Sequence, residues 1–205
     1  VTIDFNGSTV GYFLNNANAT ADMQGVYFNK VKMLNITKPV LYSSVAGYGY
    51  NNFIVENCDF HIAAAAQAKF QLINFYKSSV LHTYKKIVFD NNLVYCDDAA
   101  HQVQIMNYDQ NVAQAGSPWE AEVSMCNNTI YNMPSNNGYF KFYEVKSMKM
   151  NKNIFWADAA TKLASYCIII YSAAQDGTVF DTTDNIAFGL DGASVMPYSF
   201  DEMDR

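Results

Sequence analysis

A short pattern recurs along this chain and constrains its fold more than any other feature. In each copy, alternating apolar residues lead to one or two Asn-like residues and then to an apolar pair. If the copies are aligned on one anchor column, the steps between them are 34, 36, 25 and 32 residues. The anchors are Cys58, Asn92, Asn128, Asn153 and Asn185, and an earlier copy at 31–36 would place Asn35 there, 23 residues before Cys58. Repeats of this length indicate a chain built from stacked supersecondary units.

Between the anchors lies a second short run that is rich in aromatic and β-branched residues, with mostly period-two alternation. Such runs are typical of β-strands, and the sequence contains no heptad and no long amphipathic helix. The runs cover residues 70–75, 102–106, 139–143 and 166–171. Propeller blades and hairpin sandwiches keep tighter spacing, whereas a solenoid absorbs insertions in loops. We therefore predict an all-β fold, a single-stranded right-handed parallel β-helix of about six coils that forms one domain over residues 1–205.

The anchor column suggests how the coils turn and stack. Asn tolerates the left-handed backbone conformation that a bend between two strands requires. On stacked coils its amide can also bond to the Asn above and below, as in the ladders of stacked parallel strands. We predict both roles for the anchor residues.

Composition excludes several classes of function. Charged residues make up 16 % of the chain, the net charge is −6 and the one arginine is Arg205. Nucleic-acid binding needs clusters of basic residues, so no nucleic-acid partner is expected. No apolar run is long enough for a membrane span. The four cysteines form no C-x-x-C pair, and we interpret them as small buried hydrophobes whose disulfide state the sequence leaves open.

The runs FIVENCDFHI, IVFDNNLVYC, VSMCNNTIYN and MKMNKNIFWA resemble coils of the pectin lyase-like superfamily of right-handed parallel β-helices. The resemblance covers roughly residues 26 to 190 and lies in the repeat pattern. It implies a secreted or cell-surface bacterial protein and a polysaccharide or glycan partner. The chain begins at Val1 and shows no signal peptide, so we expect a fragment of a longer secreted protein.

An enzymatic role is the first alternative that the resemblance raises, with a polysaccharide lyase favoured over a glycoside hydrolase. Lyases of this superfamily abstract a proton beside a uronic-acid carboxylate with an Arg or Lys base, and Lys141 lies between aromatic residues at 139–143. Hydrolases of the superfamily use several Asp residues, and Asp97-Asp98 with His101 is the nearest counterpart. The other motifs of the hydrolases are absent, so a polar turn remains the simpler interpretation of that segment.

Metal binding is weakly indicated. A triad of His61, His82 and His101 would form only if the coils stacked these residues. Calcium, the one cofactor considered, would have oxygen ligands at Asp97 and Asp98 or at Asp181 and Asp184.

Glycan binding without cleavage is the function that we favour from the sequence, and a structural or adhesin module is a further alternative. Sugar rings pack on exposed aromatic side chains, and a contiguous row of such side chains would indicate a binding surface. The expected substrate-binding residues are Trp119, Tyr139 and Tyr143. Trp156 is expected to cap the core instead.

Overall fold

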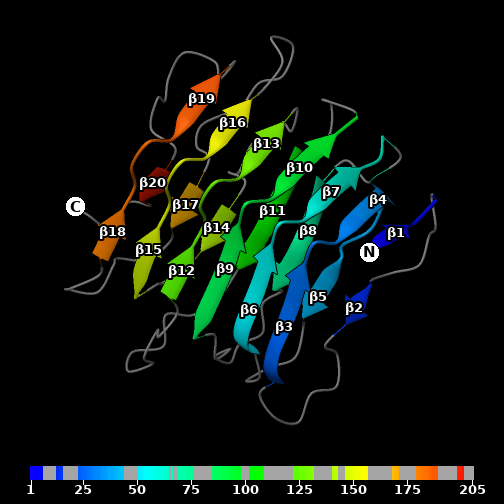
Figure 1. Ribbon diagram of the computed structural model, residues 1–205, viewed down its shortest axis with the longest axis horizontal. Coiled ribbons are helices and arrows are strands. Elements are labelled where there is room, and N and C mark those ends of the chain that lie inside the picture. The colour runs from blue at the N-terminus through cyan, green and yellow to red at the C-terminus, as the bar shows by residue number, and fades with distance from the viewer. Residues whose placement is uncertain are drawn as a thin grey trace.

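The computed structural model consists of short β-strands stacked in parallel sheets, and the part of the chain that it describes contains no helix (Figure 1). The described residues are 1–6, 13–15, 23–43, 50–64, 66, 69–75, 85–97, 102–108, 122–131, 140–142, 146–156, 168–170, 179–188 and 198–200.

Three sheets account for all the described strands. Sheet A contains β1 (Thr2–Asp4), β4 (Lys32–Ile36), β7 (Asp59–Ile62), β10 (Leu93–Cys96), β13 (Thr129–Tyr131), β16 (Ile154–Trp156) and β19 (Ile186–Phe188). Sheet B contains β2 (Leu14–Asn15), β5 (Leu41–Ser43), β8 (Lys69–Phe75), β11 (Gln102–Tyr108), β14 (Phe140–Phe142), β17 (Ile168–Ile170) and β20 (Tyr198–Phe200). Sheet C contains β3 (Met23–Asn29), β6 (Tyr50–Glu56), β9 (Lys86–Asp90), β12 (Glu122–Ser124), β15 (Ser147–Lys149) and β18 (Val179–Asp181).

The chain contributes to sheets A, B and C in strict rotation, so every strand pairs with the strand three elements away. All of these pairings are parallel. The described strands form stacks of seven, seven and six, compared with the six coils predicted. The predicted all-β class and the parallel stacking of the repeats are thus confirmed.

The core lies between the three sheets and is dominated by phenylalanine. Side chains alternate along a strand, and on β7 and β10 every second residue is accordingly buried. The fully buried aromatic side chains are Phe53, Phe60, Phe70, Phe89, Phe140 and Phe155. Phe60 and Phe89 stack with ring centroids 6.2 Å apart, so the aromatic content of the sequence serves in part to fill this core.

The asparagine ladder is confirmed at the anchor column. Asn92, Asn128 and Asn153 are buried, and each donates its backbone N–H to the side-chain oxygen of the next anchor at 2.9–3.0 Å. Cys58 donates its N–H to Asn92 Oδ1 in the same way, at 2.9 Å. The ladder lies at the bend between sheets C and A.

The predicted left-handed conformation of the anchors is wrong by one residue. Positive φ angles of 55–58° occur at the residue before each anchor instead. Those residues are Asn57, Asn91, Asn127, Lys152 and Asp184. The two predicted roles therefore belong to two neighbouring residues. The first adopts the left-handed conformation and exposes its side chain, and the second, the anchor, buries its side chain.

The earliest copy of the repeat is also shifted from its predicted register. Lys32 pairs with Asp59, so Val31 and not Asn35 stands beside Cys58. Lys30, with φ of 55°, takes the left-handed position in this coil. Asn35 has φ of 55° as well, but it lies at an irregularity within β4 where the register changes.

Three of the cysteines are buried, as predicted, and they are not joined in disulfides: Cys58, Cys96 and Cys126. Burial raises the pKa of the Cys58 thiol, which keeps it protonated and unreactive. Cys167 lies outside the described residues.

Candidate functional site

The outward face of sheet A carries the clearest concentration of exposed aromatic side chains. On its strands the inward positions are apolar and buried, as at Phe60, Val94, Ile130 and Phe155. The flanking residues therefore point to solvent in two lines that cross the strands. One line consists of Asp59, Leu93, Thr129, Ile154 and Ile186, and the other of His61, Tyr95, Tyr131, Trp156 and Phe188.

We call the second line the aromatic row. Each member lies directly opposite the next on the neighbouring strand, so the row crosses β7, β10, β13, β16 and β19 without a gap. With strands about 4.8 Å apart, it extends over roughly 19 Å. Tyr131, Trp156 and Phe188 are 40 %, 51 % and 53 % exposed, so half of this aromatic surface is open to a ligand.

The rings within the row contact one another. His61 and Tyr95 stack nearly parallel with centroids 4.8 Å apart. Trp156 lies 6.0 Å from Tyr131 and 5.8 Å from Phe188, with the rings inclined. These contacts limit the rotamers of the exposed rings, so part of the entropy cost of binding is met before a ligand arrives.

The prediction that Trp156 caps the core is wrong. Alternation on β16 buries Phe155, which is 1 % exposed, and turns Trp156 outward. Trp156 is 51 % exposed, so its ring does not cover the core.

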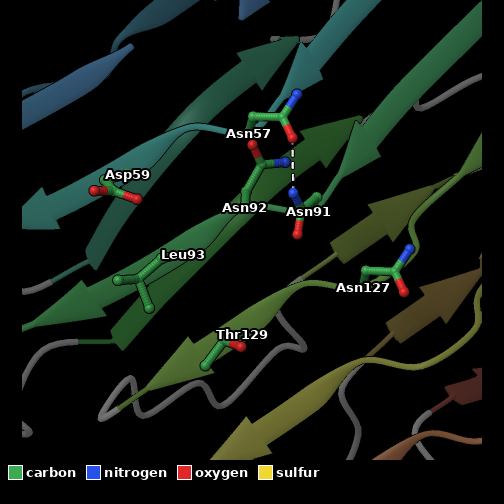
Figure 2. Close-up of a pocket in the computed structure, with 7 residues that line it drawn as sticks. All are labelled: Asn57, Asp59, Asn91, Asn92, Leu93, Asn127 and Thr129. Atoms are coloured by element: carbon green, nitrogen blue, oxygen red, sulfur yellow. Dashed lines mark hydrogen bonds between the residues drawn. The ribbon is translucent and has the colours of Figure 1, made fainter. Parts of the chain in front are cut away.

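A shallow hollow of about 390 Å³ opens beside the aromatic row (Figure 2). The wall of the hollow at the bend between sheets C and A is polar, because the exposed side chains of the residues with positive φ lie there. It is lined by Asn57, Asp59, Asn91, Asn92, Leu93, Asn127 and Thr129. Asn91 Nδ2 donates to Asn57 Oδ1 at 2.7 Å, which aligns these two amides across neighbouring strands.

The hollow and the aromatic row belong to one face. Asp59, Leu93 and Thr129 line the hollow, and the row begins two residues further along the same strands. Two residues of an extended strand span roughly 7 Å. Amides, a carboxylate and a hydroxyl thus lie next to a strip of aromatic rings.

One end of the row is held by a polar network around His61. Its Nδ1 accepts the backbone N–H of Asn35 at 3.4 Å, so a proton on the neutral ring belongs on Nε2. Nε2 lies 2.8 Å from Asp97 Oδ2, although no well-aligned hydrogen bond joins them. The irregularity at Asn35 thus orients a histidine that lies on the next strand.

Carboxylates near this end affect the neighbouring groups. Burial raises the pKa of the Tyr95 hydroxyl, and the charges of Asp59 and Asp97 raise it further, so the phenol stays neutral. The pKa of Asp4 is lowered, mainly by the hydrogen bond from Asn35 Nδ2 at 2.8 Å and then by the N–H of Asn6.

A second polar group lies on sheet B. Asn107 Nδ2 donates to Asn74 Oδ1 at 3.3 Å, and both side chains are buried. Asn107 Oδ1 has no hydrogen-bond partner among the residues that the structure describes. The backbone of Lys141 in β14 is in register with Asn107.

Several other predicted site residues lie outside the described part of the chain: Asp98, His101, Trp119, Tyr139, Tyr143 and His82. Asp97 is described, and its carboxylate approaches His61. Among the described residues no group of three or more His, Cys, Asp or Glu side chains is arranged to hold a metal ion. Of the calcium candidates, Asp181 accepts a hydrogen bond from Asn151 and Asp184 is one of the left-handed residues.

Sequence reasoning missed Tyr95, Tyr131 and Phe188 as a group, although a signal existed. Every member of the aromatic row stands three residues after an anchor of the repeat. If the copies are aligned on the anchors, this column contains only His, Tyr, Trp and Phe. A column of one chemical kind at an outward position points to a shared surface role.

Comparison with protein-family models, with curated proteins and with solved structures finds no match for this chain. In the part of the chain that is described, no helix has the length and apolar character that crossing a membrane requires. The function has to be inferred from the residues themselves.

Proposed function

We propose that this chain is a right-handed parallel β-helix of the pectin lyase-like kind that binds a polysaccharide along the outward face of sheet A. The cyclic order of the three parallel sheets and the buried asparagine ladder support this assignment of the fold. A location outside the cell or on its surface is part of the same proposal and follows from the resemblance.

The observation that carries the binding proposal is the uninterrupted aromatic row. Binding sites for small molecules and sugars combine flat apolar surface with a few convergent polar groups. The row supplies ring faces at intervals of one strand, and the adjacent hollow supplies amides and the Asp59 carboxylate. A glycan chain that runs across the strands would place successive rings over successive aromatic side chains.

Intrinsic fluorescence tests the proposal and locates the site. The two tryptophans are Trp119 and Trp156, so each can be silenced singly by substitution with Phe. With a panel of soluble polysaccharides, we expect a ligand-dependent fluorescence change that persists in Trp119→Phe and disappears in Trp156→Phe. Retardation in polysaccharide-containing native gels provides an independent readout. A change that depends only on Trp119 would contradict the choice of sheet A, and the absence of binding to any polymer would contradict the function.

The second candidate function is a polysaccharide lyase, and the buried polar pair on sheet B favours it. Buried amide oxygens without a partner are uncommon in folded proteins. Asn107 Oδ1 has none among the described residues, and the backbone of Lys141 occupies the neighbouring register position. This alternative predicts an unsaturated, ultraviolet-absorbing product from polyuronates that Lys141→Ala abolishes and Lys149→Ala, on sheet C, retains. Failure of the unmodified protein to form the product from any polyuronate would eliminate it.

A further inference from the structure

The charged side chains on the strands of the aromatic row, and directly after them at Asp97, are acidic. The five strands that form the row contain no Lys or Arg. Asp59 stands two residues before His61 on β7, and Asp97 follows β10 directly. Described cations lie at the margins of this face: Lys32 stands opposite Asp59 on β4, and Lys30 and Lys152 lie at the bends before β4 and β16.

These carboxylates have acceptor capacity to offer a ligand. The described residues place no hydrogen bond or ion pair on the Asp59 carboxylate, which lines the hollow. Asp97 is half exposed, with one oxygen near His61 Nε2. An ionised carboxylate only accepts hydrogen bonds, so its partner in a ligand has to be a donor such as a hydroxyl.

We propose, building on the glycan-binding role, that the ligand of this face is an uncharged polysaccharide whose hydroxyl groups donate to Asp59 and Asp97, and that the same two carboxylates reject polyuronates. Hydrogen bonds to ionised acceptors are stronger than those between neutral groups, so hydroxyl-rich chains gain affinity here. A uronic acid replaces a hydroxymethyl donor with a second negative charge. Like charges that face each other across an interface disfavour the wrong partner and slow its association.

The expected specificity differs from the uronic-acid preference that the superfamily resemblance implies. The sequence pattern determines the stacking of the coils, whereas the ligand is selected by the outward side chains. In this chain those side chains are aromatic and acidic where a polyuronate would require Lys or Arg.

Matched polymers test this specificity. Mixed-linkage β-glucan, mannan and galactan are each compared with their own C6-carboxylated derivatives, by calorimetry and by gel retardation. We expect every neutral polymer that binds to lose at least about tenfold in affinity on carboxylation at low salt, and less at high salt, where charges are screened. In the double variant Asp59→Asn and Asp97→Asn, the difference in log Kd between the neutral and the carboxylated polymer should fall to half or less of its value in the unmodified protein.

The outcomes separate the two proposals. Binding that requires Trp156 but is equal or tighter for the carboxylated polymer would overturn the uncharged-ligand inference and leave the binding role intact. If neither form of any polymer binds, the proposed function fails, and the inference fails with it. Discrimination that survives in the double variant would show that other groups reject the polyuronate, which also overturns the inference.

Discussion

Replacing Asn128 with alanine is expected to lower the free energy of unfolding by about 3–5 kcal/mol, since its side chain is 1 % exposed and serves several buried groups at once. Its Oδ1 accepts the N–H of Asn92 at 2.9 Å, and its Nδ2 donates to the carbonyl oxygen of Phe89. Alanine leaves both groups buried without a partner. Each orphaned group costs about 1–3 kcal/mol.

Denaturant unfolding followed by circular dichroism measures the effect. The matched control is Asn127→Gly at the preceding residue. Asn127 is exposed and has φ of 57°, a conformation that glycine adopts freely. Removal of its side chain should therefore lower the free energy of unfolding by less than about 1 kcal/mol. Equal losses from the two substitutions would show that the buried amide has no special role in the stacking of the coils.

The contrast between these two neighbours shows what the sequence could reveal about the bend. Two copies of the repeat have Asn at both positions, as in Asn91-Asn92 and Asn127-Asn128. Asn suits a left-handed residue and a ladder residue equally well, so composition alone does not assign the roles. The copy with Lys152 before Asn153 distinguishes them, because only a solvent-facing position accommodates that charge.

The fold class was predictable because every coil has to meet the same local requirements in order to stack on the next coil. Alternation, a two-residue bend and a buried amide recur often enough to be detected in spite of irregular spacing. The register of the first coil was not predictable in this way. Asn35 fits the sequence pattern of an anchor, but it lies at an irregularity within β4.

The candidate site was less accessible, because it depends on contacts between coils. His61 and Asp97 are far apart in the sequence and come together only through the pairing of β7 with β10. The aromatic row changes residue type at almost every step, so it is detected only when the copies of the repeat are aligned on their anchors. Trp156 looked like a core residue because the run before it is apolar, and only the inward position of Phe155 decides its direction.

The largest expected effect on binding follows from removing the two central rings of the aromatic row. Tyr131 and Trp156 are half exposed and contact each other with centroids 6.0 Å apart. Buried Trp and Tyr side chains dominate binding energies at interfaces, with about 2 kcal/mol or more lost on truncation to alanine. We therefore expect the double variant Tyr131→Ala and Trp156→Ala to bind a neutral polysaccharide at least about 100-fold more weakly.

The control is Tyr27→Ala, which removes a more exposed ring from sheet C. Tyr27 is 64 % exposed and lies away from the aromatic row, so its removal should leave the affinity within about twofold. All three positions face solvent, and surface substitutions of this kind change stability by about 0.5 kcal/mol each. Unchanged melting temperatures with a selective loss of affinity would assign the effect to the ligand contact. If the double variant and Tyr27→Ala bind alike, sheet A is not the binding face.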